Sequence, residues 1–254
     1  MSVFSGDRPI AFVTGGAKRV GRASCLALAR AGCDVLTTYR SSEDEAMALA
    51  GEVRELDREA DGCALDLDDL DSVTDAGERL ARELPRLDVL VHNASVYAPS
   101  PLEKLSADEL LAQYRVNAAA PALLSSRLAP LLRASDRPGG GAVVAMCDIH
   151  AMGRPRAGHL AYAMSKAALV ELINVLALNL APEVRVNGVA PGVVEWPDEG
   201  YESDEASQQR YLKRVPLDRP GTPEEAAETV RWLALDATYL TGQVVRVDGG
   251  RWIT

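Results

Sequence analysis

The chain has 254 residues, of which 47% are hydrophobic and 25% charged, and its 37 acidic residues outnumber its 27 Lys and Arg residues for a formal net charge of −10. This size and composition are typical of a soluble globular protein with a sizeable core, and they exclude a disordered chain and a small disulfide scaffold. The acidic balance argues against nucleic-acid and anionic-membrane partners, because both require a basic surface.

Short apolar runs alternate with helical patterns along the whole chain. Near-continuous apolar runs are typical of parallel strands covered on both faces. The predicted strands span Pro9–Val13, Asp34–Thr38, Gly62–Leu65, Leu87–His92, Ala142–Cys147, Arg185–Val189 and Gln243–Val247. The predicted helices span Val20–Ala31, Ser42–Arg58, Leu70–Glu83, Ala107–Leu132, Leu160–Leu180 and Pro223–Leu235. Strict alternation predicts the α/β class, with one doubly wound, Rossmann-type parallel sheet of seven strands, helices on both faces, and a single domain over residues 1–254.

Residues 193–215 interrupt this alternation with an acidic, irregular stretch that contains Pro197 and Gly200. Long loops in compact domains are often functional, and doubly wound sheets bind ligands at the carboxyl ends of their strands. We therefore expect a substrate lid at about residues 193–215. The alternative is a solvated surface loop.

The sequence carries no mark of export or of a metal site. Residues 1–8 lack the basic and apolar regions of a secretory signal, and no uninterrupted apolar run reaches the length of a membrane span. The four cysteines, Cys25, Cys33, Cys63 and Cys147, form no Cys-x-x-Cys pair and have no neighbouring histidine. We expect reduced thiols in a cytoplasmic protein that binds no metal ion and no membrane.

A glycine-rich turn joins the first predicted strand to the first helix, in the segment Thr14-Gly15-Gly16-Ala17-Lys18-Arg19-Val20-Gly21. Glycines allow a tight turn and a close approach of the backbone to a pyrophosphate, and the helix N-terminus adds free N–H groups and a positive dipole end. Any strand-to-helix turn can use glycine, but its place on the first strand predicts a dinucleotide site.

The end of the second predicted strand indicates which dinucleotide binds. An NAD site has a carboxylate there for the ribose hydroxyls, about 20 residues after the glycines. This chain has Arg40 and Ser41 instead, and Lys18 and Arg19 add positive charge on the adjoining loop. A guanidinium and a hydroxyl suit a 2′-phosphate, which favours NADPH over NADH. The alternative is that Arg40 is only a solvated residue at the strand end.

Tyr162 and Lys166 are four residues apart on one predicted helix, so their side chains share a face. A free tyrosine titrates near pH 10, and a neighbouring cation lowers its pKa toward the working range of a proton donor. This spacing is common by chance when taken alone.

Together the glycine turn, His92-Asn93-Ala94-Ser95, Asn117, the Tyr162/Lys166 pair and Pro191-Gly192 resemble the short-chain dehydrogenase/reductase family across the whole chain. The resemblance implies a nicotinamide cofactor, Tyr162 as proton donor, Lys166 on the nicotinamide ribose and Asn117 on a water-mediated proton path. It also implies Asp66 near the adenine. The cofactor residues that it implies are Gly15, Lys18, Arg19, Gly21, Tyr39, Arg40, Ser41, Asp66, Leu67, Asn93, Ala94, Ser95, Tyr162, Lys166, Pro191 and Gly192.

Three departures from the family pattern are similar to its pteridine reductase branch. Arg19 replaces the middle glycine of the turn, Asp148 replaces the usual serine before the tyrosine, and Tyr97 follows the Asn-Ala-Ser segment. In that branch an aromatic residue at the Tyr97 position stacks on the pterin, whereas residues 149–160 correspond to nothing in it. The candidate substrate residues are Arg19, Ser95, Tyr97, Asp148, Tyr162 and Trp196, and the candidate catalytic residues are Asp148, Tyr162, Lys166 and Asn117.

The chemistry of Asp148 favours the same branch. A serine hydroxyl stabilises the oxyanion that develops from a ketone, whereas an ionised carboxylate repels it and suits a substrate with N–H donors. The sequence therefore predicts NADPH-dependent reduction of a pterin or dihydropteridine C=N bond. The alternative is a reductase of 3-oxoacyl thioesters or other ketones, in which Asp148 is protonated or has only a structural role. A more remote alternative is a non-catalytic NADPH sensor.

The predicted helices Ala107–Leu132 and Leu160–Leu180 carry apolar residues around most of their circumference. A helix of this kind needs a second apolar partner besides its own sheet, which predicts a homo-oligomer and, with the family resemblance, a homotetramer. We expect His92, His150 and His159 at the surface or at the rim of the site.

Overall fold

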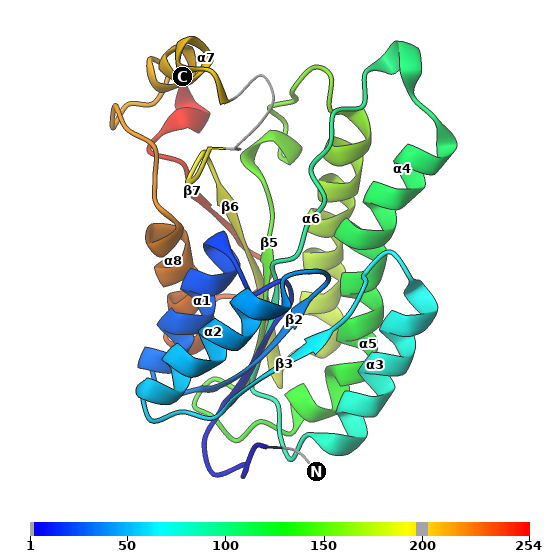
Figure 1. Cartoon of the computed structure of the whole chain (residues 1–254), viewed down its shortest axis with the longest axis vertical. Coiled ribbons are helices and arrows are strands. Elements are labelled where there is room, and N and C mark those ends of the chain that lie inside the picture. The colour runs from blue at the N-terminus through cyan, green and yellow to red at the C-terminus, as the bar shows by residue number, and fades with distance from the viewer. Residues whose placement is uncertain (1–2, 197–202) are drawn as a thin grey trace.

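One parallel sheet forms the centre of the computed structural model, which describes residues 3–196 and 203–254. The strand order is β3-β2-β1-β4-β5-β6-β7, and every neighbouring pair runs parallel (Figure 1). The strands are β1 (Ile10–Val13), β2 (Asp34–Tyr39), β3 (Ala60–Ala64), β4 (Val89–His92), β5 (Gly141–Met146), β6 (Val184–Pro191) and β7 (Val244–Val247). The predicted doubly wound, seven-stranded α/β fold is confirmed.

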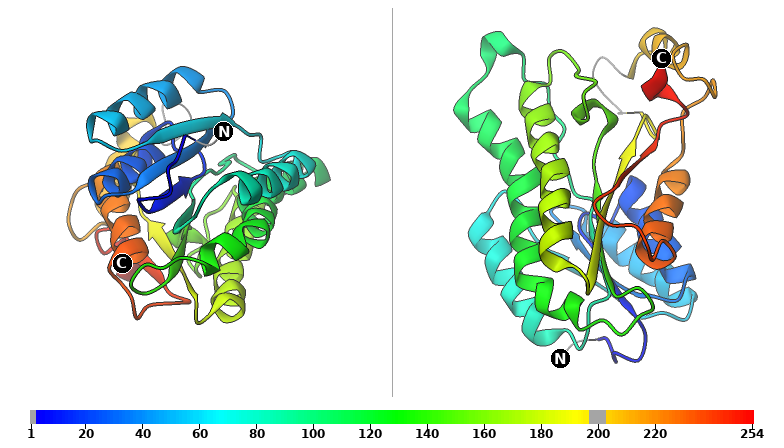
Figure 2. Two further views of the ribbon diagram at one scale, coloured as in Figure 1. Left: turned by 90° about the horizontal axis from the view of Figure 1, so that it is seen from below. Right: turned by 180° about the vertical axis from the view of Figure 1, so that it is seen from behind.

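Helices cover both faces of the sheet (Figures 1 and 2). On one face lie α1 (Arg19–Arg30), α2 (Glu43–Glu55) and α8 (Pro223–Leu235). On the other lie α3 (Leu70–Glu83), α4 (Ala107–Tyr114), α5 (Ala120–Arg133) and α6 (Leu160–Leu180). A short helix, α7 (Glu205–Leu212), stands beside the C-terminal segment, beyond the sheet (Figure 1).

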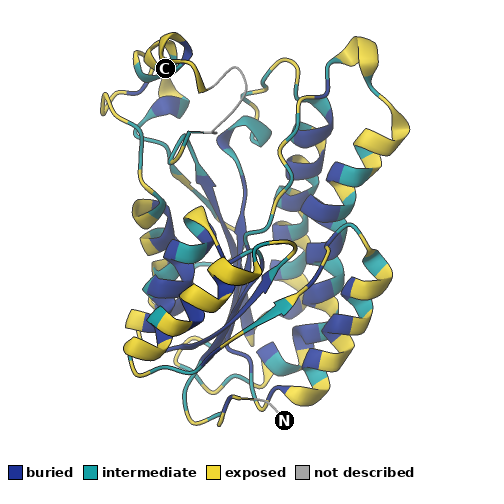
Figure 3. Ribbon diagram, in the orientation of Figure 1, coloured by how far each residue is buried: buried dark blue, intermediate teal, exposed yellow. Residues whose placement is uncertain are grey.

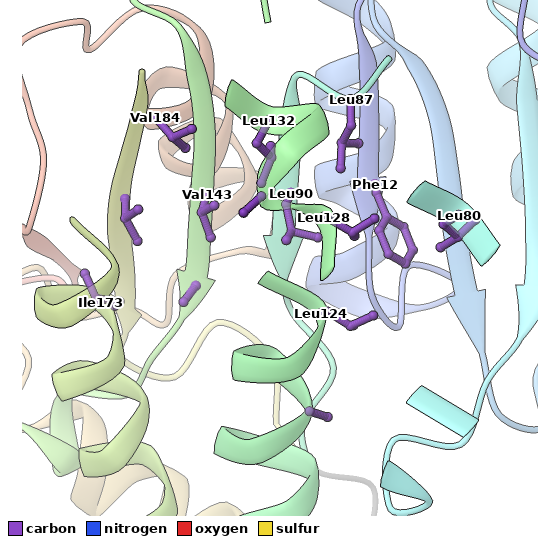
Figure 4. Close-up of a cluster of buried hydrophobic side chains, with 14 of the residues drawn as sticks. Phe12, Leu80, Leu87, Leu90, Leu124, Leu128, Leu132, Val143, Ile173 and Val184 are labelled. Carbon is purple, nitrogen blue, oxygen red and sulfur yellow. The ribbon is translucent and has the colours of Figure 1, made fainter. Parts of the chain in front are cut away.

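The core consists of two apolar layers, one on each face of the sheet. The five strands from β2 to β6 in the sheet order are almost wholly buried, whereas the edge strands β3 and β7 are partly exposed (Figure 3). Between the sheet and helices α3, α5 and α6, Phe12, Leu90 and Leu128 are fully buried (Figure 4). Each side chain of this size contributes about 1.5–3 kcal/mol when it is buried. This packing fixes the carboxyl ends of the strands, from which the site residues extend.

Helix α6 is long and apolar enough to cross a membrane by length and composition, and it is the one such helix within residues 3–196 and 203–254. In the fold it packs along β6 and α4, and Leu169 and Ile173 are buried against the sheet. One face of α6 is therefore a core face, and this face accounts for part of its apolar composition, since 39% of its apolar window is buried.

The helix predicted over Ala107–Leu132 is not continuous. It divides into α4 and α5, with one wider π-helical turn at Arg115–Ala119 between them. Pro121 has no N–H to donate to the carbonyl of Asn117 four residues earlier, so the regular α-helical ladder cannot run through this point. Turns of this type are frequent at functional sites.

The expectation of an irregular stretch over residues 193–215 is also wrong in part, because α7 lies within it. The Asp204 side chain accepts a hydrogen bond from the Ser207 backbone N–H and starts this helix. Residues 197–202 of the expected lid lie outside the described residues.

Candidate active site

A cavity of about 470 Å³ lies at the carboxyl ends of β1, β2 and β4. We call it the glycine-loop cavity. It is beside the point where the strand order reverses, which is where doubly wound sheets bind dinucleotides. Twelve of the predicted cofactor residues line it: Gly15, Lys18, Arg19, Gly21, Tyr39, Arg40, Ser41, Asp66, Leu67, Asn93, Ala94 and Ser95.

The glycine loop is shaped by close approaches that leave no room for side chains. Gly15 has a φ of +63°, and a Cβ at Gly21 would lie 2.3 Å from the Gly15 carbonyl oxygen. The Asn93 side-chain amide donates to the carbonyls of Thr14 and Gly15, at 3.0 Å each. Asn93 therefore holds the loop against β4 and sets the shape of the cavity.

Free donors face this cavity. The first turn of α1 has no side-chain cap, so its backbone N–H groups are available to a phosphate. Arg40 is exposed and has no ion-pair or hydrogen-bond partner in the described part of the chain. By contrast, Lys18 pairs with Glu45 at 2.7 Å, and Arg19 pairs with Glu195 at 3.1 Å. Arg40 is therefore the guanidinium that is poised for a 2′-phosphate.

A second cavity, of about 330 Å³, opens from the first, and Arg19, Ser95 and Glu195 line both. We call it the Tyr162 cavity. The predicted residues Arg19, Ser95, Tyr97, Asp148, Tyr162, Lys166, Pro191 and Gly192 line it. A dinucleotide in the first cavity would therefore reach the phenol in the second.

The Tyr162 hydroxyl donates a 2.8 Å hydrogen bond to Asp148 Oδ2. The other Asp148 oxygen accepts from the His150 backbone N–H at 2.6 Å, which fixes the carboxylate at the start of the loop after β5. Lys166 is 2% exposed, and its Nζ donates to the Met146 carbonyl at 2.7 Å and lies 6.0 Å from the Tyr162 ring centroid. Phenol, carboxylate and ammonium thus belong to residues that line one cavity.

The pKa of Tyr162 differs from the expectation. Burial, followed by the charge of Asp148 and the hydrogen bond to it, raises the pKa of Tyr162 well above 10. Burial also lowers the pKa of Lys166. The nearest charge to the phenol is an anion rather than the ammonium, so the phenol keeps its proton at neutral pH.

Sequence reasoning left the segment after Asp148 unplaced, and the structure puts four of its residues into the lining of the Tyr162 cavity: Ile149, His150, Arg156 and His159. The His159 ring stacks on Tyr97, with centroids 4.8 Å apart and planes at 13°, and Tyr97 meets Tyr162 edge-on at 4.7 Å. The cluster of basic residues in that segment was the feature of the sequence that could have indicated its place in the site.

Asn117 and Trp196 lie outside both cavities. Asn117 is fully buried, its amide donates to the Val96 carbonyl and Ser165 Oγ, and its carbonyl accepts from Ser95 Oγ and the Val96 N–H. Its side chain therefore positions the loop that carries Tyr97. Trp196 packs edge-on against Tyr211, a cavity residue that sequence reasoning missed.

The expectation that His92 lies at the surface or rim is wrong. The residue is 3% exposed at the end of β4, and its Nε2 pairs with Ser125 Oγ at 2.8 Å. Burial lowers its pKa from 6.5 to about 3. It is a neutral core residue, whereas His150 and His159 do line the site.

A doubly wound sheet with a glycine-loop cavity that opens onto a Tyr-Lys pair defines a nicotinamide-dependent oxidoreductase. Residues 15–251 match the family model described as enoyl-(acyl carrier protein) reductase. The chain belongs to the short-chain dehydrogenase/reductase family, whose members use a nicotinamide cofactor.

Several relatives align over nearly the whole chain. An uncharacterised oxidoreductase of Mycobacterium tuberculosis is 32% identical, over 98% of this chain and 94% of its own. The 3-oxoacyl-[acyl-carrier-protein] reductase FabG of Thermotoga maritima is 31% identical, over 95% and 96%. A blue fluorescent protein from a metagenomic library, solved in complex with NADPH, is 32% identical with a TM-score of 0.85, over 96% and 97%.

Proposed function

We propose that this protein is an NADPH-dependent reductase of the C=N bond of a pterin or dihydropteridine. The observation that carries the proposal is the carboxylate of Asp148, which lies in the Tyr162 cavity and is hydrogen-bonded to the proton-donating phenol. The coarser activity, that of a family oxidoreductase, rests on the fold and the relatives.

The carboxylate supports a nitrogen heterocycle as the substrate. An ionised Asp148 would repel the oxyanion that develops when a ketone is reduced. Pterin rings present N–H and amino donors, which a carboxylate accepts in charge-assisted hydrogen bonds. Its second oxygen is already held by the His150 backbone N–H, so the group is fixed in place for such a substrate.

The aromatic lining supports a flat substrate. Tyr97 is 40% exposed, its ring stacks on the imidazole of His159, and it meets the Tyr162 ring at nearly a right angle. Aromatic rings favour stacked and edge-to-face neighbours at such separations. A planar ring that replaces or extends this stack would lie beside both Asp148 and the Tyr162 hydroxyl.

The cofactor preference follows from the glycine-loop cavity. The tight contacts at Gly15 and Gly21 and the uncapped first turn of α1 fit a pyrophosphate, and Arg40 and Ser41 fit a 2′-phosphate. When bound, NADPH supplies the hydride. Lys166, which lines the adjoining cavity together with Pro191 and Gly192, is the family's nicotinamide-ribose residue.

The protein's own residues handle the proton. Tyr162 holds it on its hydroxyl at neutral pH, because burial and Asp148 raise the pKa of the phenol. A substrate nitrogen that becomes more basic during reduction takes this proton. Lys166 supplies the positive charge that compensates the phenolate, and the Met146 carbonyl fixes its position.

A second candidate is the reduction of 3-oxoacyl thioesters or other ketones. The names of relatives favour it, since the Thermotoga maritima enzyme is a 3-oxoacyl-[acyl-carrier-protein] reductase. This candidate requires Asp148 to be protonated or to act only in the structure of the loop, where it caps the turn at Ile149–Ala151.

The substitution Asp148→Ser separates the two candidates. Loss of a positioned electrostatic partner costs about 10²–10³-fold in rate. We expect that loss in kcat/KM for dihydrobiopterin, with NADPH binding nearly unchanged, whereas activity on an acetoacetyl thioester holds or rises. NADPH consumption by the purified protein measures both.

Tyr162→Phe is the control, because it removes the proton donor for both substrate classes. If Asp148→Ser leaves dihydropterin turnover intact, or if the unmodified enzyme reduces acyl thioesters far better than any pterin, the pterin assignment fails and the ketone reductase stands.

A further inference from the structure

A third cavity, of about 430 Å³, continues from the Tyr162 cavity, and His150, Arg156 and Tyr211 line both. We call it the Arg214 cavity. It lies between the loop after β5, helix α7 and the C-terminal segment, which Figure 1 shows close together beyond the sheet. A substrate bound beside Tyr162 would extend into it.

The lining of this cavity is strongly basic. Arg156, Arg210, Arg214, Arg251 and His150 contribute to it, and no acidic side chain does among the described residues. The whole chain has a net charge of −10, so the charge of this cavity lining is opposite in sign to that of the protein as a whole. Clefts lined by one sign of charge concentrate ligands of the other sign.

Arg251 is a buried member of this cluster that lacks part of its hydrogen bonding. The residue is 5% exposed, and its Nε has no partner within the described residues. Its guanidinium lies over the Tyr211 ring, 5.3 Å from the centroid. A buried donor without a partner is costly, and an anion in the cavity would relieve that cost.

The groups around Arg251 hold its backbone in place but leave the Nε of its side chain without a partner in the described residues. The backbone of this segment is anchored by Arg154, which donates to the Arg251 carbonyl at 2.8 Å. The nearby carboxylate of Asp248 accepts from the backbone N–H groups of Gly250 and Trp252. Burial is the main cause that lowers the pKa of Arg251, and the positive charges of Arg154 and Arg214 lower it further, whereas Tyr211 and Asp248 act in the opposite direction.

Arg214 is the accessible member. The residue is exposed two positions after the end of α7, and its side chain has no hydrogen-bond or ion-pair partner in the described part of the chain. The exposed guanidinium of Arg214 and the buried one of Arg251 line the same cavity, and guanidinium groups bind a carboxylate or phosphate through paired hydrogen bonds.

We propose that the Arg214 cavity binds an anionic tail of the substrate, a carboxylate or phosphate group on the molecule whose reacting part lies beside Tyr162. The inference rests on the proposed function in taking the Tyr162 cavity as the substrate site. It adds a requirement on the substrate, namely a negatively charged group beyond the reacting ring or carbonyl.

Binding of anionic probes to the protein saturated with NADP⁺ tests this proposal, because the cofactor then occupies the other phosphate site. The probes are p-aminobenzoyl-triglutamate for a carboxylate tail and coenzyme A for a phosphate tail. Their neutral counterparts are p-aminobenzamide and pantetheine. In calorimetric titrations we expect at least one anionic probe to bind about tenfold or more tightly than its counterpart, and more weakly as salt is added.

Arg214→Glu should weaken that binding by about tenfold or more. Lys213→Glu is the matched control, since Lys213 is exposed, carries the same charge and does not line the cavity. The probe that responds identifies the tail as carboxylate or phosphate. Binding of neither anionic probe, no advantage over the neutral ones, or equal weakening by Lys213→Glu would overturn the proposal.

These outcomes are separable from those of the proposed function, because binding is measured without turnover. Anion binding with no reduction of dihydropterins or thioesters would refute the proposed function and keep the anion site. Reduction of a dihydropterin by a protein whose anion binding does not change with Arg214→Glu would support the proposed function and refute the anion site.

Discussion

Single side chains at the two ends of the joined cavities set the charge that each ligand meets. At one end, Asp148 presents a carboxylate that accepts the hydrogen bond of the Tyr162 hydroxyl. At the other end, Arg40 presents a guanidinium that no acidic residue in the described ranges neutralises. Asp148 stands where the family usually has a neutral serine, and Arg40 stands where an NAD site has a carboxylate. A single substitution at either position therefore changes the charge that the ligand meets.

The preference for NADPH can be tested at Arg40. The change Arg40→Asp removes a partner for the 2′-phosphate and adds a repulsive charge. Losing charge-assisted hydrogen bonds costs about 1.5–3 kcal/mol, and about 1.4 kcal/mol corresponds to a tenfold effect. The ratio of kcat/KM for NADPH to that for NADH should therefore fall at least about tenfold.

Arg30→Asp is the charge-matched control for this ratio, because Arg30 is exposed at the end of α1 and lines neither cavity. An unchanged ratio in Arg40→Asp would mean that the protein reads the phosphate at another residue.

At the scale of elements, the packing of α5 and α6 against the π-helical turn decides which polar groups Asn117 contacts. The π-helical turn before α5 turns Asn117 toward the backbone of Val96 and the hydroxyl of Ser165 on α6. These hydrogen bonds join the π-helical turn, helix α6 and the loop that carries Tyr97. The turn thus acts on the site by holding a loop in place.

The contact between β4 and α5 makes stability depend on pH through His92. Burial lowers the pKa of its imidazole from 6.5 to about 3. Below pH 6.5 the unfolded chain binds a proton that the folded protein does not, so the free energy of unfolding falls as the pH is lowered toward 3. The slope reaches about 1.4 kcal/mol per pH unit for one group.

Urea denaturation between pH 4.5 and 7 measures this slope. His92→Gln keeps a side chain that can pair with Ser125 and removes the titration, so its free energy of unfolding should fall less steeply with acid. Identical slopes for both proteins would show that His92 does not control the acid sensitivity.

For the whole molecule, the apolar residues that the sheet leaves uncovered predict a homo-oligomer, and the family resemblance makes a homotetramer the expected form. On α6, Met164, Val175 and Leu178 are exposed, and Leu178 is 83% exposed. On the adjacent helix α4, Leu111 and Tyr114 are half-exposed. Apolar groups gathered on two packed helices favour a partner surface of the same kind.

Light scattering at micromolar concentration should therefore give the mass of a homotetramer. Leu178→Glu should shift the distribution toward smaller species, whereas Met47→Glu should not, since Met47 is exposed on α2 at the other face of the sheet. A stable monomer for the unmodified chain would contradict this prediction.

The sequence by itself determined the features that depend on short stretches of chain. The alternation of apolar runs and helical patterns predicts the sheet, because strand and helix periodicities are local. The glycine loop and the Tyr162–Lys166 spacing are also local, and the structure brings these residues into two joined cavities. Even the single predicted helix Ala107–Leu132 fails only where Pro121 breaks its ladder.

Only the tertiary structure decided the contacts between distant segments. The raised pKa of Tyr162, the stack of His159 on Tyr97 and the burial of His92 each depend on how helices pack on the sheet. The basic cavity joins His150 to Arg251, which lies about a hundred residues further along the chain. Such contacts leave no periodic signal, because burial and electrostatic environment come from the packing of the whole fold and not from neighbours in sequence.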